Sequence, residues 1–193
     1  MERWNMADSN ITKQALVAAL CALMAEQPFE KINVAHICER CGMNRKSFYY
    51  HFRDKYDLVN WIFDTEFIAL LKDERLGGNY DEHWSFVEKA CRYFYEHHEF
   101  YRKALQIEGQ NSFEDHFREY IRPLLAERVS CMLEPDEMDV FSMDFFTDAL
   151  ICAVERWLMT KDCMPPEAFV EKLRRLIEQG AVFIYNEISG PDR

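Results

Sequence analysis

Residues 33–55 read NVAHICERCGMNRKSFYYHFRDK, and the rest of the chain is interpreted outward from this stretch. Its first part carries apolar side chains at the spacing i, i+3, i+4 and i+7, which predicts a short helix with one buried face: Val34, Ile37, Cys38 and Cys41. Gly42 is expected to end this helix, because glycine readily adopts a left-handed conformation. Asn44 is expected to cap the next helix by accepting a backbone N–H bond. Two helices joined by about three residues are typical of a helix-turn-helix.

The second helix, expected over residues 45–53, carries most of its polar side chains on the outside. Phe48 and Phe52 lie one turn apart and are expected to hold it against the first helix. The outward residues are then Arg45, Lys46, Ser47, Tyr49, Tyr50, His51 and Arg53. Residues 40–55 contain five Lys or Arg and one acidic residue, a local charge of +4 in a chain whose total is −11. This basic region indicates a polyanionic partner, and such a helix suits the major groove of DNA.

Residues 37–59, ICERCGMNRKSFYYHFRDKYDLV, resemble the N-terminal DNA-binding region of the TetR family of regulators. The family pattern is approximately I-A-x-x-A-G-V-S-x-x-T-[LF]-Y-x-[HY]-F-x-x-K-x-x-L. The residues that match it in register are Gly42, Asn44, Ser47, Phe48, Tyr49, His51, Phe52, Lys55 and Leu58. Cys38 and Cys41 replace small Ala-like residues, and Asn44 replaces a capping Ser or Thr. The resemblance covers about residues 10 to 60, close to a third of the chain.

This resemblance implies a homodimeric repressor of transcription that binds a palindromic operator in double-stranded DNA. By the resemblance, Tyr49, His51 and Lys55 match positions that usually contact phosphates. The better candidates for base contacts are Arg45, Lys46, Ser47 and Tyr50. The expected positions agree with this division, because Lys55 begins the following helix while Arg45 lies at the tip of the inserted one. An enzyme is not expected, since no phosphate-binding loop, metalloprotease motif or nucleophile elbow occurs in the sequence.

The whole chain of 193 residues is expected to be all-α, with about nine helices. Only six glycines and six prolines occur, so turns are few. The expected domains are a helix-turn-helix domain at residues 9–56 and a C-terminal effector-binding and dimerisation domain at residues 57–190. The first helix is expected to start at Ser9 or Asn10, after a poorly ordered leader. We expect a cytoplasmic protein without a membrane segment, because no signal pattern and no run of 18 apolar residues is present.

Two later helices, the fourth and the seventh, also have expected boundaries. Asp54 is expected to cap the fourth helix, which should continue to Gly77 and Gly78. Ser112 is expected to cap a helix that begins at residue 113.

The region between Trp84 and Trp157 is rich in aromatic residues, and two interpretations of it are equally favoured. One is an ordinary core, and the other is a ligand cavity, because pockets are often lined by aromatic side chains. The TetR resemblance implies an effector pocket here, whose candidate lining is Tyr93, Tyr101, Phe113, Phe117, Phe146 and Trp157. A branch of this family, the activators of dihydroxyacetone-kinase operons, takes its signal from a partner protein. The alternative function is therefore a coactivator controlled by a partner protein instead of a small ligand.

Two long helices, expected at residues 135–160 and 165–188 and started by prolines, have apolar residues on more than one face. This exceeds what one small core needs, and adjacent small residues in the second helix allow close helix approach. We therefore expect the two helices to pair with those of a second copy in a four-helix dimer interface. The interface candidates are Phe141, Phe145, Cys152, Leu173, Ile177, Gly180, Ala181 and Ile184.

Three other patterns are interpreted as structural. The pair Cys38 and Cys41 is isolated and lies on a core face, so packing is favoured over zinc or redox chemistry. His97 and His98 are adjacent and point in different directions on a helix, so no metal site and no cofactor is expected. Glu155 and its neighbour Arg156 are expected on a solvated helix face.

Overall fold

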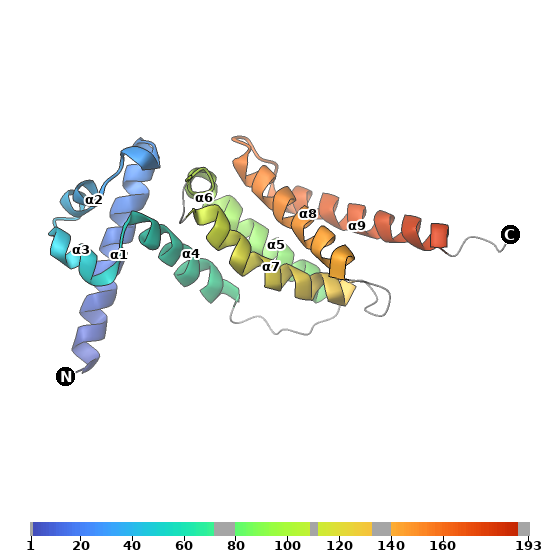
Figure 1. Cartoon of the computed structure of the whole chain (residues 1–193), viewed down its shortest axis with the longest axis horizontal. Coiled ribbons are helices and arrows are strands. Elements are labelled where there is room, and N and C mark those ends of the chain that lie inside the picture. Colours follow the sequence, from blue (N-terminus) through green and yellow to red (C-terminus); the bar gives the residue numbers. More distant parts are fainter. Residues whose placement is uncertain (1, 72–79, 109–111, 133–139, 189–193) are drawn as a thin grey trace. The chain divides into compact units, whose positions relative to one another are not determined.

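The structure is a computed structural model that describes residues 2–71, 80–108, 112–132 and 140–188 (Figure 1). Within these ranges it contains nine α-helices, one short 3-10 helix and no strand, which confirms the expected all-α fold. The elements are α1 (Glu2–Glu26), η1 (Phe29–Lys31), α2 (Val34–Arg40), α3 (Arg45–His51), α4 (Lys55–Leu71), α5 (Tyr80–Glu96), α6 (His98–Ala104), α7 (Phe113–Met132), α8 (Val140–Met159) and α9 (Pro166–Ile188). None of the helices in the described ranges has the length and apolarity that crossing a membrane requires.

The helix boundaries agree with the sequence at several caps and differ at the first helix. The Asp54 carboxylate accepts the Asp57 backbone N–H at 2.8 Å, which confirms the expected cap of α4. Ser112 Oγ accepts the Asp115 backbone N–H at 3.2 Å at the start of α7. However, α1 begins at Glu2 and not after Ser9 or Asn10, because residues 2–26 contain neither glycine nor proline to interrupt it. The expected helix end at Gly77 and Gly78 and a proline start at Pro135 lie outside the described residues.

The chain divides by contacts into two compact units. The first comprises residues 1–73 and 98–117, and the second comprises residues 74–97 and 118–193. The first unit therefore includes α6 and the beginning of α7 in addition to α1–α4. The domain boundary expected between residues 56 and 57 stays a prediction, because the two contact units are not continuous segments of the chain.

The first unit has an aromatic core centred on Phe63 of α4. Its ring centroid lies 5.1 Å from that of Phe67, 5.5 Å from that of Phe113 and 6.4 Å from that of Tyr101. All four side chains are fully buried. Aromatic pairs at these separations stabilise the fold by more than their buried area alone, so these rings hold α4, α6 and α7 together.

Two polar contacts also join distant segments of the first unit. The Lys103 ammonium of α6 donates to the carbonyls of Met24 and Ala25 in the last turn of α1. Helix C-terminal carbonyls lack partners within the helix, so a cation there supplies hydrogen bonds and offsets the helix dipole. The Lys103 contacts therefore tie the position of α6 to the end of α1. His116 Nε2 and Asp64 Oδ1 form a second contact at 2.8 Å, which joins α7 to α4.

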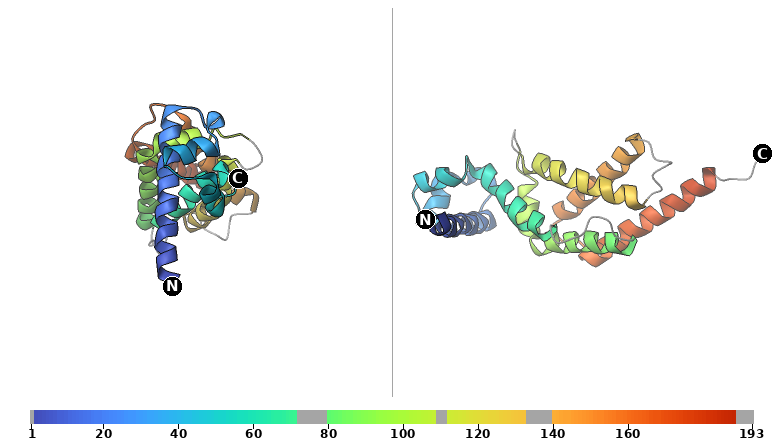
Figure 2. Two further views of the ribbon diagram at one scale, coloured as in Figure 1. Left: turned by 90° about the vertical axis from the view of Figure 1, so that its left-hand side faces the viewer. Right: turned by 90° about the horizontal axis from the view of Figure 1, so that it is seen from below.

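The second unit is held by a stack of three aromatic rings. The Trp157 ring of α8 stacks on the Phe169 ring of α9, with ring centroids 4.5 Å apart and ring planes nearly parallel. It also stacks with the Tyr95 ring of α5, whose centroid lies 6.3 Å from that of Trp157. The Trp157 indole N–H donates to the Met164 carbonyl at 2.8 Å, so its polar group is satisfied. Helix α9 packs against α5 (Figure 2, right).

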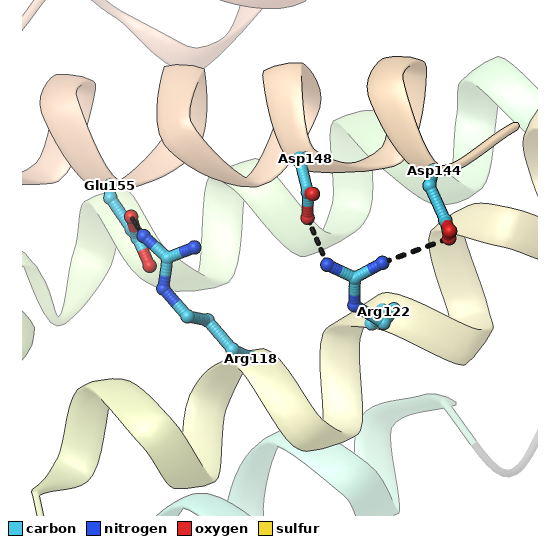
Figure 3. Close-up of polar contacts among 5 residues, drawn as sticks. All are labelled: Arg118, Arg122, Asp144, Asp148 and Glu155. Atoms are coloured by element: carbon cyan, nitrogen blue, oxygen red, sulfur yellow. Dashed lines mark hydrogen bonds and ion pairs between the residues drawn. The ribbon is translucent and has the colours of Figure 1, made fainter. Parts of the chain in front are cut away.

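Arginine side chains of α7 connect it to acidic residues of α8 (Figure 3). Arg118 pairs with Glu155 at 2.5 Å, and Arg122 contacts Asp144 at 3.1 Å and also Asp148. Glu155 is only 13% exposed, so the expectation of a solvated face is wrong for Glu155, whereas Arg156 is exposed as expected. The burial of this carboxylate is compensated by Arg118, which lies on a helix distant in sequence.

Candidate nucleic-acid interface

The helix-turn-helix is shaped by two asparagine caps and one glycine. Asn33 accepts the His36 backbone N–H at 3.0 Å and begins α2, and Asn44 accepts the Ser47 backbone N–H at 2.9 Å and begins α3. Gly42 has φ +67° in the turn between them, so the expected left-handed glycine is confirmed. The sequence did not single out Asn33, although an Asn just before an apolar helical repeat is a recognised start signal.

Helix α3 is anchored by a buried phenylalanine and exposes most other side chains. Phe48 is fully buried, and Phe52, directly after the helix, is buried as well, as expected. Tyr49 and Tyr50 are 58% and 81% exposed, which is high for such large side chains. Arg45 and Lys46 are also exposed, at the N-terminal end of the helix. The structure therefore gathers cations and phenols on one short helix whose inner face is fixed.

Ser47 and His51 are less accessible than the other candidate DNA contacts. The Ser47 hydroxyl lies 3.3 Å from the Asn44 side-chain oxygen and takes part in the cap of α3. His51 is half-buried, with its ring 4.9 Å from that of Tyr50. Burial, and after it the nearby charge of Lys13, lowers the pKa of His51 below its ordinary value. His51 is thus favoured as a neutral hydrogen-bonding group instead of a cation.

Lys55, the first residue of α4, has a role within the fold that the sequence did not indicate. Its ammonium donates to the carbonyls of Phe29 and Ile32, both at 2.7 Å, and lies 4.1 Å from the Phe29 ring centroid. Burial lowers the pKa of this ammonium from its ordinary value. An ammonium has three N–H donors, so one donor remains for other partners. Contact of Lys55 with a phosphate stays a prediction.

The cysteines of the turn are consistent with packing. Cys38 is buried, and this burial, more than the neighbouring Cys41, raises the pKa of its thiol. Cys41 is half-buried, and its Sγ lies 3.2 Å from the Ile37 carbonyl of its own helix. Among the described residues, no group of three or more His, Cys, Asp or Glu side chains is placed to hold a metal ion.

The six candidate pocket residues are divided between the two contact units. Three of them are buried in the first unit: Tyr101, Phe113 and Phe117. The other three belong to the second unit, where Trp157 is buried in its stack while Tyr93 and Phe146 are partly exposed. An effector pocket lined by these residues stays a prediction.

The candidate dimer residues also differ in exposure. Phe141 and Phe145 of α8 are 75% and 60% exposed, and Cys152 is exposed as well. Leu173 of α9 is instead buried within its own unit. Leu176 of α9, which sequence reasoning missed, is 67% exposed, although it continues the apolar stripe of α9 at i+3 from Leu173.

Ile177 of α9 is partly buried. The environments of Gly180, Ala181 and Ile184 lie outside the described side chains. Participation of all these residues in a dimer stays a prediction.

Comparison with known proteins gives two family matches that together cover most of the chain. Residues 16–62 match the family described as bacterial regulatory proteins, tetR family, and residues 82–179 match a transcriptional regulator C-terminal region of the same family. The chain belongs to the TetR family of transcriptional regulators. The helix-turn-helix of this TetR-family regulator is thus a DNA-binding element, and the family and its matched relatives are regulators and not enzymes.

The similar proteins include a transcriptional activator, known both as a sequence and as a solved structure. The HTH-type dhaKLM operon transcriptional activator DhaS of Lactococcus lactis is 29% identical over 113 residues, which are 58% of this chain and 58% of that relative. A solved structure of the dihydroxyacetone kinase operon activator DhaS has a TM-score of 0.65 at 20% identity and covers 88% of this chain and 96% of the other.

Two further solved structures have the same fold. A TetR regulator from Streptococcus agalactiae has a TM-score of 0.66 at 19% identity, covering 89% and 96% of the two chains. NalD, a secondary repressor of a multidrug efflux pump in Pseudomonas aeruginosa, has a TM-score of 0.64 at 19% identity, covering 90% and 96%. At these identities the structural likeness supports the fold alone.

Proposed function

We propose that this TetR-family regulator is a homodimeric repressor that binds a palindromic operator through α3 and responds to an effector in its C-terminal region. The observation that carries this proposal is the exposed, cationic end of α3, where Arg45 and Lys46 extend from a helix anchored by buried Phe48. A rigidly held helix with exposed cations and hydroxyls can enter the major groove and contact base edges.

The candidate residues have different roles in this proposal. The base contacts are Arg45, Lys46, Ser47 and Tyr50. The phosphate contacts are Tyr49, His51 and Lys55. An arginine that is bidentate to guanine discriminates against other bases by about 1–3 kcal/mol, whereas a phosphate contact strengthens binding to all sequences. Arg45→Ala is therefore expected to relax sequence preference, and Lys55→Ala is expected to weaken specific and random DNA alike.

Dimerisation is supported by the exposed apolar side chains of α8. Phe141 and Phe145 lie one turn apart and are both largely exposed, which is a liability for a monomer in water. Covering them with the same surface of a second copy produces a two-fold interface. In general, two-fold dimers of helix-turn-helix proteins read half-sites about 34–36 Å apart, or a related distance. The proposed interface also includes the exposed Leu176 and the α9 candidates other than Leu173, which is buried within its own unit.

The dimer is tested by replacing the exposed phenylalanines with a charge. Phe141→Asp combined with Phe145→Asp is expected to convert the dimer to a monomer in sedimentation velocity, because a dimer would have to bury both carboxylates. Met164→Asp is the matched control, since Met164 is also an exposed apolar residue but lies outside the proposed interface. A double variant that still sediments as a dimer contradicts this interface.

A second candidate function is a transcriptional activator controlled by a partner protein. The similarity to the dhaKLM operon activator of Lactococcus lactis favours it. The two candidates differ in what changes transcription. In a reconstituted transcription assay, a repressor lowers transcription until a small molecule is added, whereas an activator of this kind raises it only when a second protein is present.

The proposal as a whole is tested by mapping the binding sites of the purified protein on genomic DNA. The expected result is a small set of sites that share a palindrome whose half-sites are separated by about one duplex turn. Binding spread evenly over the DNA, with no shared palindrome, would contradict the proposed operator recognition. The genes beside the mapped sites then indicate which small molecules or partner proteins to test.

A further inference from the structure

Lys13 of α1 lies beside the C-terminal end of α3, although the two helices are far apart in sequence. Its ammonium is 5.2 Å from the Trp61 ring centroid and 5.9 Å from the Phe52 ring centroid. Phe52 directly follows α3, and the side chain of Lys13 is partly exposed. The two buried or half-buried rings therefore hold the ammonium near the reading helix without removing it from water.

A row of side chains continues from Lys13 onto the exposed surface of α3. The His51 ring centroid is 6.3 Å from that of Phe52 and 4.9 Å from that of Tyr50, which is the most exposed tyrosine of the helix. The charge of Lys13 is felt at His51, where it contributes, after burial, to a lowered pKa. A second cation at His51 is therefore disfavoured while Lys13 is charged.

A cation near the C-terminal end of α3 favours the approach of this end to DNA. Helix carbonyls give this end a partial negative charge, which repels phosphates. Arg53 also lies here, with its largely exposed guanidinium 3.7 Å from the Asp57 carboxylate. The Lys13 ammonium faces the rings of Phe52 and Trp61, and its side chain stays partly exposed. Lys13 thus provides positive charge at this end that a phosphate can use.

We propose that Lys13 contacts a DNA phosphate and adds a cation from α1 near the C-terminal end of α3, while His51 acts there as a neutral hydrogen-bonding group. This inference rests on the proposed insertion of α3 into the major groove. It adds a DNA contact from α1, a helix outside the helix-turn-helix. The ring contacts hold Lys13 at this place. Because a phosphate contact does not read the bases, the contribution of Lys13 to DNA affinity is expected to be independent of the base sequence.

The salt dependence of DNA binding tests this proposal in the full-length protein. Each phosphate that a cation neutralises steepens the plot of log affinity against log salt by about 0.9 on duplex DNA. Fluorescence anisotropy between about 50 and about 200 mM KCl is measured on the mapped binding site and on random duplex. Lys13→Gln is expected to flatten the slope by about 1 on both DNAs, and Lys13→Arg is expected to restore it. Lys161→Gln, at an exposed lysine of the second unit, is expected to leave it unchanged.

Two further variants separate a DNA contact from a purely structural role. Lys13→Met keeps the apolar stem of the side chain on the rings but removes the charge, and it is expected to flatten the slope as Lys13→Gln does. His51→Gln keeps a neutral polar group and is expected to leave the slope unchanged. An unchanged slope for Lys13→Gln and Lys13→Met, or a flattened slope for His51→Gln, would overturn the proposal. A wild-type protein that binds neither DNA would instead contradict the proposed function itself.

Discussion

Lys55 provides the sharpest stability prediction, because its ammonium is placed between two backbone carbonyls. Lys55→Met keeps most of the side-chain stem but removes the donors to Phe29 and Ile32, both at 2.7 Å. A hydrogen bond from a charged group contributes about 1.5–3 kcal/mol, so two of them set an upper range of about 3–6 kcal/mol. Partial exposure of the lysine and water access to the carbonyls reduce this, and we expect a loss of about 2–4 kcal/mol.

The assay for this prediction is thermal and urea unfolding followed by circular dichroism, with Lys46→Met as the matched control. Lys46 is exposed on α3, so the control is expected to change the free energy of unfolding by less than about 0.5 kcal/mol. For a chain of this length, 1 kcal/mol corresponds to about 2–4 °C, so Lys55→Met is expected to lower Tm by about 4–16 °C. Equal unfolding midpoints for the two variants would refute the structural role that we assign to Lys55.

Three other substitutions test the turn and the contact between α7 and α8. Gly42→Ala is expected to lower the free energy of unfolding by about 1–2 kcal/mol. The cost comes from the left-handed backbone alone, because a Cβ at Gly42 meets no atom within 4 Å. Hydrogen exchange that this variant accelerates more in α9 than in α2 and α3 would contradict this. Asn44→Ala is expected to cost about 0.5–2 kcal/mol in urea unfolding and to weaken DNA binding, and unchanged values of both would contradict the cap. Arg118→Met removes the guanidinium from Glu155, which is largely buried, and is expected to cost up to about 3–5 kcal/mol. The double variant with Glu155→Met is expected to recover most of that loss, and additive losses would contradict the coupling.

The helix-turn-helix was predictable from sequence because its determinants are local. The left-handed Gly42, the cap at Asn44 and the buried Phe48 each depend on residues within about one helical turn, where spacing is informative. The inward contacts of Lys55 were not predictable in this way. They join residues 23 and 26 positions apart, and a lysine beside a DNA-binding helix is equally consistent with a phosphate contact.

The C-terminal helices were located by sequence, but the faces that they bury were not. Prolines correctly marked the start of α9, yet Glu155 was assigned to solvent because its partner Arg118 lies on another helix. Leu173 and Leu176 occupy one apolar stripe, and only the packing within the second unit shows that the first is buried and the second exposed. Periodicity identifies a stripe, whereas its coverage depends on how the other helices pack against it.

The central claim is that the exposed residues of α3 recognise a DNA sequence, and one competition measurement tests it directly. The full-length protein and the variant Arg45→Ala/Lys46→Ala/Tyr50→Ala are compared for binding to the mapped site and to a scrambled duplex of equal length. The three side chains are exposed, so the variant is expected to keep its fold. We predict that the wild-type preference for the mapped site falls by at least about tenfold in the variant, as expected for the loss of about 1–3 kcal/mol per base contact. A folded variant that prefers the mapped site as strongly as the wild type would contradict the account.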